Sequence, residues 1–204
     1  MLALILAAWV ASAVEIERVL AVVDRTPILA SDVELATIAQ LVPRDEGESD
    51  ESLRSATLEA LIALELRWQD LEAAAIAART TVDVDASWAR VAQRAGGEDV
   101  LRERLLAAGF SEAVLRALLR RAAVVQSYVT SHFAPFVRPT VEEITAVYER
   151  ELVPALRAAG DEVPSLDAMR ADIEALVRER KLLAELERWT AELEGRVQVV
   201  RYSR

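Results

Sequence analysis

The last part of the chain, from Ser165 to Tyr202, constrains the fold more than any other stretch. It begins like one long amphipathic helix, because Ser165 can cap a helix start and apolar residues then recur at steps of three, four or seven. This stripe consists of Leu166, Met169, Ile173, Leu176, Leu183, Leu186 and Leu193. Gly195 is expected to end the helix in a left-handed conformation. At ~1.5 Å per residue such a helix measures on the order of 45 Å, so its apolar stripe must pack against earlier parts of the chain.

The residues after this helix predict a short strand that needs a partner. The run VQVVRY over 197–202 is rich in β-branched residues, and an isolated strand leaves its backbone groups unpaired. A matching signal lies near the other end of the chain, where Val19–Val23, a turn over 24–27 and Ile28-Leu29 predict a hairpin. Because three strands are far more stable than an isolated hairpin, we expect the terminal strand to join it.

Between these ends, the sequence predicts helices almost throughout. The expected helices run from Ser31 to about Leu41, from Leu53 to about Ala78, from Asp83 or Asp85 to Ala95, from Glu98 to Ala108, from Ser111 to near Pro135, and from Thr140 to about Leu152. Two begin with capping boxes, Ser31 with Glu34 and Thr140 with Glu143. Residues 153–164, which contain Gly and Pro, are expected to form a linker.

The predicted fold is therefore mainly α, with a small β-sheet formed by the N-terminal hairpin and the C-terminal strand. We expect the last helix to pack against the helices that begin at Leu53 and Ser111. Trp68 and Trp189 lie close to apolar stripes and are interpreted as core residues. Trp88 lies among small and polar residues, so we expect it to be exposed.

The first 13 residues, MLALILAAWVASA, predict a signal peptide. They carry no charged side chain and are too short to cross a bilayer, which takes about 20 apolar residues. Ala11-Ser12-Ala13 fits a small-residue cleavage site, which gives a mature start at Val14. Export to a bacterial periplasm, with no stable membrane anchor, follows from this interpretation. Because a basic segment is missing before the apolar run, a buried N-terminal helix is the alternative.

Charge and composition exclude several kinds of chemistry. The net charge of −10 disfavours nucleic acid as a partner, because phosphates would be repelled. The absence of cysteine removes disulfides, thiolate nucleophiles and zinc–thiolate sites. His132 is the only histidine, and its place at a predicted helix end favours an electrostatic role. We therefore predict no catalytic residue, no metal site and no cofactor.

The order of these elements resembles SurA-type periplasmic chaperones, specifically their N-terminal chaperone domain. The residues that carry the resemblance are Val19 to Asp24, Ile28, Ser31-Asp32-Val33, Gly96 to Phe110, Ser111-Glu112, Leu115 to Arg121, Pro139 to Tyr148 and Ser165 to Trp189. The chain departs from the family at the first turn, where Arg25 and Thr26 replace a common glycine. It also lacks the parvulin-type prolyl isomerase domain, because residues 153–164 are far fewer than the ~40 that a small folded domain needs.

The resemblance implies that residues 14–204 form an ATP-independent chaperone domain that binds unfolded polypeptides, outer-membrane proteins among them. Such a protein needs a shallow apolar groove that tolerates many sequences. Trp88, Phe110 and Tyr128 are the candidate client-binding residues. Two alternatives remain open: a protein related to peptidyl-prolyl cis-trans isomerases with residual activity, and a helical envelope subunit that binds one fixed partner.

Overall fold

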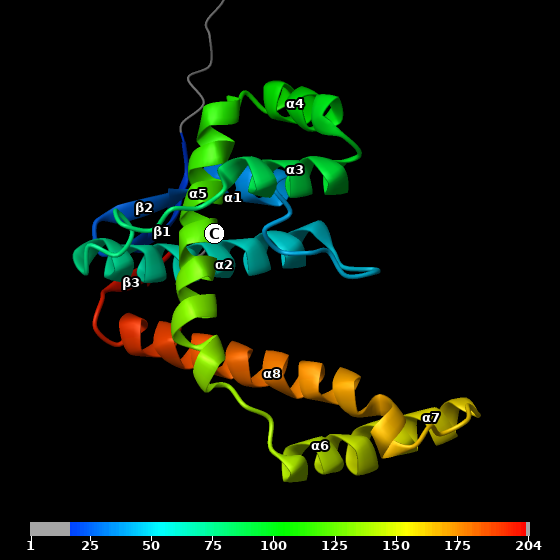
Figure 1. Ribbon diagram of the computed structural model, residues 1–204. Helices are drawn as coiled ribbons and strands as arrows, with labels where there is room; N and C mark the ends of the chain where they lie inside the picture. The colour runs from blue at the N-terminus through cyan, green and yellow to red at the C-terminus, as the bar shows by residue number, and fades with distance from the viewer. Residues whose placement is uncertain (1–16, 203–204) are drawn as a thin grey trace, which may run out of the picture.

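The two ends of the chain form one small antiparallel sheet in the computed structural model, which describes residues 17–202 (Figure 1). Strands β1 (Val19–Val23), β2 (Thr26–Leu29) and β3 (Val199–Arg201) lie in the order β2-β1-β3. At the centre of the sheet, Val22 pairs with Pro27 on one side and with Val200 on the other. The predicted pairing of the terminal strand with the hairpin is confirmed. The predicted signal peptide, Met1–Ala13, lies outside the described residues.

The hairpin turn contains no glycine and uses Asp24 instead. Val23 pairs with Thr26, so the loop has two residues, and Asp24 adopts a positive φ of 54°. Asp tolerates this left-handed conformation better than most residues, because its short polar side chain can bond locally. The Asp24 amide donates to the carbonyl of Gln198 at 2.8 Å, which ties the turn to the chain just before β3.

Helices make up most of the remaining chain. The α-helices are α1 (Ala30–Ile38), α2 (Asp50–Ala73), α3 (Val84–Ala95), α4 (Glu98–Ala107), α5 (Glu112–His132), α6 (Val141–Val147), α7 (Val153–Ala159) and α8 (Leu166–Glu194). A short 3-10 helix, η1 (Ala134–Phe136), follows α5, and a π-helical segment, η2 (Tyr148–Leu152), joins α6 to α7. The mainly α fold with a small sheet agrees with the prediction.

Local capping signals located several helix starts. Thr140 and Glu143 form the predicted capping box of α6, and the Ser165 hydroxyl accepts the Ala168 amide at the start of α8. The start of α1 was predicted wrongly. It begins at Ala30, and the carboxylate of Asp32, not that of Glu34, reaches back to accept the Leu29 amide at 2.8 Å. The Leu29 amide faces away from β1, so Asp32 is the carboxylate one helical turn away that can reach it.

Two helix ends also differ from the prediction. Helix α2 stops at Ala73, and Ala75 follows with a positive φ of 55°. Because an alanine run contains no stop signal, the helix was predicted to continue to about Ala78. Gly195 was expected to adopt a left-handed conformation, but it remains right-handed with φ −69° and ψ −18°. The chain can turn into β3 from this conformation because the Val197 amide bonds the Leu193 carbonyl.

The predicted linker over 153–164 is half helical. Residues 153–159 form α7, which continues from η2, and Gly160 then ends it with φ 78°. Proline in a helix removes an amide donor and crowds the preceding turn, and the wider π-helical turn just before Pro154 accommodates it. Only residues 160–165 connect α7 to α8.

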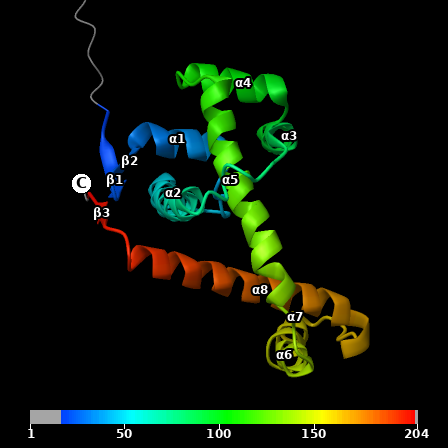
Figure 2. The same cartoon turned by 60° about the vertical axis from the view of Figure 1, so that its left-hand side comes forward.

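Three apolar clusters stabilise the fold. The first joins the sheet to α2, the second half of α5 and the end of α8. The second joins α1, α3, α4 and the first half of α5. The third lies between α6 and the first half of α8, where Ile144, Val147, Ile173 and Val177 are buried. Helix α8 therefore belongs to two cores, and its first half extends with α6 and α7 away from the sheet (Figure 2).

The end of α8 contacts α2 and α5, the two helices against which it was predicted to pack. Trp189 Nε1 donates to Asp70 of α2 at 3.2 Å, and the Trp189 ring lies 5.2 Å from that of Tyr128 in α5. Arg67 of α2 also donates to Thr190 through both Nε and Nη2. The predicted packing of the last helix is confirmed, and it brings residues more than a hundred positions apart into contact.

Candidate functional site

An open groove of about 760 Å³ lies where the start of the sheet meets α1 and α2. Its apolar wall comprises Leu20, Ala30, Val33, Ile38, Leu58 and Tyr202, and its polar lining comprises Arg18, Glu34, Thr37, Glu51, Arg54 and Ser55. Because the charged residues are two arginines and two glutamates, the rim carries both signs. A groove of this composition accepts apolar side chains and offers partners to polar groups beside them.

Regular spacing explains how the two helices supply this lining. In α1 the lining residues follow the pattern i, i+3, i+4, i+7, i+8 from Ala30, and in α2 they follow i, i+3, i+4, i+7 from Glu51. These spacings place side chains on one face of a helix. The two faces meet along the groove, and the sheet closes its end.

The sheet contributes Leu20 and Tyr202 through an irregularity of β1. The pairing of β1 with β2 shifts register between Val19 and Ala21, and Leu20 lies at this shift. A bulge of this kind redirects a side chain, and Leu20 packs against the main core while lining the groove. The Tyr202 amide donates to the Leu20 carbonyl at 2.9 Å, which fixes the chain end beside it. Pairing of the two chain ends therefore completes the wall of the groove with Tyr202.

A second, smaller hollow of about 260 Å³ lies between β2, α1, α2 and α5. Its polar side chains are connected: Glu65 Oε2 accepts from Arg121 at 2.9 Å, and Glu65 Oε1 accepts from Gln69 at 2.9 Å. The Arg121 guanidinium also lies 5.4 Å from the ring of Trp68. Glu65 is buried, so these contacts satisfy a carboxylate that water reaches poorly. The geometry indicates a structural role for this cluster.

Asp32 also lines this hollow, and its carboxyl is expected to make the stability of the fold depend on pH. Burial raises the pKa of the Asp32 carboxyl, while the bond from the Leu29 amide opposes this effect. Because the folded protein favours the protonated acid, stability is lost as pH rises above about 4, the ordinary pKa of Asp. Asp32→Asn keeps an oxygen for the Leu29 amide and removes the charge. We expect its stability, relative to wild type, to improve from pH 3.5 to pH 7 in urea unfolding.

Asp32→Ala is the matched control, because it removes the charge and the acceptor together. It should be less stable than Asp32→Asn at both pH values, since the Leu29 amide loses its partner. A stability difference between Asp32→Asn and wild type that stays constant with pH would contradict the assignment of this carboxyl.

Trp88, the first predicted client-binding residue, is buried and not exposed. Its exposed fraction is 3%, and the Arg116 guanidinium lies 4.8 Å from the centre of its ring. The expectation of exposure was wrong because it weighed the small and polar neighbours in α3. The buried side of α3 repeats at i, i+3, i+4 and i+7 from Trp88 through Val91, Ala92 and Ala95. This spacing was present in the sequence and indicates a core position.

Phe110 and Tyr128 are partly buried and lie in different parts of the molecule. Phe110 packs against the same cluster as Trp88, whereas Tyr128 packs against the main core. Tyr128 stacks on His132 with ring centres 4.2 Å apart, which places the lone histidine on the last turn of α5. The structure does not bring the three predicted residues together, and none of them lines either hollow.

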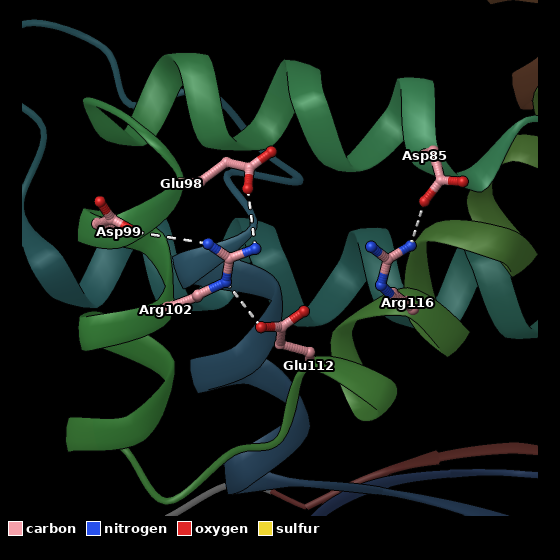
Figure 3. A network of polar contacts seen from close by, with 6 residues as sticks. All are labelled: Asp85, Glu98, Asp99, Arg102, Glu112 and Arg116. Carbon is pink, nitrogen blue, oxygen red and sulfur yellow. Dashed lines mark hydrogen bonds and ion pairs between the residues drawn. The ribbon is translucent and has the colours of Figure 1, made fainter.

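A surface network of ion pairs fixes α3 and α4 against the start of α5 (Figure 3). Arg102 of α4 donates to Glu98 and to Glu112 at 2.8 Å each, and contacts Asp99 at 3.5 Å. Arg116 of α5 donates to Asp85 at 2.6 Å while its guanidinium covers Trp88. Exposed pairs of this kind contribute little stability individually. These ion pairs therefore orient α3, α4 and the start of α5 relative to one another. Each of the four carboxylates is paired with an arginine, so they do not converge on a common ligand.

No family model matches the chain, and no curated protein matches it. Within residues 17–202, no cluster of three or more His, Asp or Glu side chains could bind a metal ion. No helix in that part of the chain combines the length and apolar character needed to span a bilayer. Of the two hollows described above, the groove is the larger, at about 760 Å³ against about 260 Å³.

Proposed function

We propose that this protein is an ATP-independent chaperone, exported to a bacterial periplasm, that binds unfolded polypeptide segments, outer-membrane proteins among them. The observation that carries the proposal is the open groove beside the paired chain ends, with an apolar wall and a rim of both charges. Such a surface binds apolar segments without selecting one sequence. The resemblance to SurA-type chaperones in the order of elements supports the same function.

The proposed mechanism is reversible binding without a chemical step. Apolar side chains of a client would enter the groove, and its polar backbone would meet the rim. The net charge of −10 would keep the loaded chaperone soluble. The resemblance to SurA-type chaperones implies that a parvulin domain would be inserted over residues 153–164. In this chain that segment holds only α7 and part of the connection to α8. We therefore propose binding, not proline isomerisation, as the activity.

Suppression of aggregation tests this proposal directly. A urea-unfolded outer-membrane β-barrel is diluted into buffer with or without stoichiometric amounts of the protein, and light scattering is followed. We expect scattering to fall markedly in the presence of the protein. Unchanged scattering would contradict the proposal. Capture of a single stoichiometric partner from envelope extracts, without any suppression, would favour the fixed-partner subunit.

Filling the groove should abolish this activity without unfolding the protein. Ser55 is exposed on α2 and lines the groove, so Ser55→Trp places a large ring where client side chains would bind. We expect at least about a tenfold loss of client affinity, the equivalent of about 1.4 kcal/mol. The measurement is fluorescence anisotropy with a labelled, unfolded β-barrel fragment.

Ser131→Trp is the matched control, because Ser131 is also exposed on a helix but lies outside the groove. It should bind the fragment like wild type, and both variants should keep the wild-type unfolding midpoint. Equal affinity of Ser55→Trp and wild type would remove the groove from the binding site.

A further inference from the structure

The two edges of the small sheet differ in whether another strand can join them. At the β2 edge, Pro27 has no amide hydrogen, and the outward Leu29 amide already donates to Asp32 at 2.8 Å. Proline and occupied donors are the usual means by which proteins prevent strand addition. The β2 edge is therefore closed.

At the β3 edge, alternate backbone groups point outward. The Tyr202 amide bonds the Leu20 carbonyl and the Gln198 carbonyl accepts from Asp24, so Gln198, Val200 and Tyr202 face β1. In an antiparallel ladder the residues between them face the opposite side. Val199 and Arg201 thus direct their amides and carbonyls away from the sheet. Among residues 17–202, no group bonds these four backbone atoms.

The surroundings leave this edge accessible. Figure 2 shows β3 at the margin of the molecule, and Arg201 is exposed. The Arg201 side chain is drawn aside, because it donates to Glu59 of α2 and to Glu194 of α8. Its guanidinium is thus occupied, while its backbone remains available.

We propose that the β3 edge binds an extended segment of the client by strand addition, which deepens and rests on the proposed function. Four backbone groups at alternate positions match the donors and acceptors of one extended peptide. Tyr202, which follows β3, lines the groove, so a segment paired with β3 lies beside it. The net charge of −10 favours a neutral or basic segment.

A second copy of this chain is not the occupant. Strand β3 has three residues, and pairing two such edges buries far less than the ~1,200 Å² of a stable interface. A client segment instead gains area from the neighbouring groove, and a short edge suits reversible binding.

The test removes one outward amide without changing the pairing with β1. Val199→Pro deletes the outward donor, and Val199→Ala is the matched control, which shortens the side chain but keeps the amide. The probe is a fluorescein-labelled peptide of sequence Lys-Val-Thr-Val-Thr-Val-Lys, measured by anisotropy. We expect Val199→Pro to weaken binding about fivefold relative to Val199→Ala, the effect of one net hydrogen bond. Hydrogen exchange of the Val199 and Arg201 amides in wild type should slow when the peptide binds.

Equal affinity of the two variants, or unchanged exchange of these amides at saturating peptide, would overturn the proposal. If Val199→Pro loses peptide binding but suppresses aggregation as well as Val199→Ala does, the edge accepts a strand but does not bind the client, and the proposal is overturned. If wild type fails to suppress aggregation, the proposed function fails, while the exchange measurement still decides whether the edge accepts a strand. An unchanged unfolding midpoint of Val199→Pro, relative to Val199→Ala, shows that the sheet is intact.

Discussion

Trp189→Ala is expected to lower the free energy of unfolding by about 3–5 kcal/mol, the range for removing a buried tryptophan. Trp189 has an exposed fraction of 8% and lies at the meeting point of α2, α5 and α8. Its ring centre is 5.2 Å from that of Tyr128 and 5.6 Å from that of Phe133. Truncation to alanine removes both aromatic contacts and leaves a cavity that these helices cannot fully close. Urea unfolding followed by circular dichroism measures the change.

Two matched variants separate the contributions of this side chain. Trp189→Phe keeps an aromatic ring but loses the donor to Asp70, so we expect it to recover most of the stability. Leu183→Ala, on an exposed part of the same helix, should change stability by no more than about 0.5 kcal/mol. A loss below about 1 kcal/mol for Trp189→Ala would show that α8 does not depend on this contact.

Deletion of residues 196–204 is expected to produce the second large effect, a loss of about 2–4 kcal/mol from the burial of Val197 and Val199. The deletion also converts β1 from the central strand into an edge, although its Ala21 and Val23 are fully buried. Hydrogen exchange of the β1 amides should accelerate, because the bonds to β3 are gone. The groove loses Tyr202 from its wall, so client affinity should fall together with stability.

A shorter deletion, of Ser203 and Arg204 alone, is the control for this experiment. It leaves β3 and Tyr202 in place, so the unfolding midpoint and the exchange of β1 should match wild type. If the long deletion unfolds like wild type, the pairing of the chain ends contributes nothing to stability, and the groove would not require it.

Several features of this fold follow from short-range patterns. The apolar stripe after Ser165 predicted α8, and the Thr140–Glu143 pair located the start of α6, because capping and periodicity depend only on nearby residues. The β-branched runs at both ends predicted a shared sheet, since neither could satisfy its backbone alone. The end of α2 was predicted wrongly, because the alanine run after Ala73 contains no local stop signal.

The candidate site depended on longer-range information. Trp88 was predicted wrongly because its polar neighbours were given more weight than the apolar spacing through Val91, Ala92 and Ala95, and the structure shows that Arg116 of α5 covers its ring. The groove joins Leu20, Leu58 and Tyr202, which are far apart in the chain and carry no shared motif. The position of Leu20 in the groove depends on a register shift in β1, and no single residue type predicts such a shift.

The sequence by itself therefore determined the helical class, the amphipathic last helix and the need for the two ends to meet. Each follows from local periodicity or from backbone groups that must find a partner. The tertiary structure alone decided which apolar side chains stay open to solvent, because burial depends on how distant helices cross. It likewise decided which sheet edge is closed by Pro27 and Asp32 and which stays open at Val199 and Arg201, since strand order determines which backbone groups face outward.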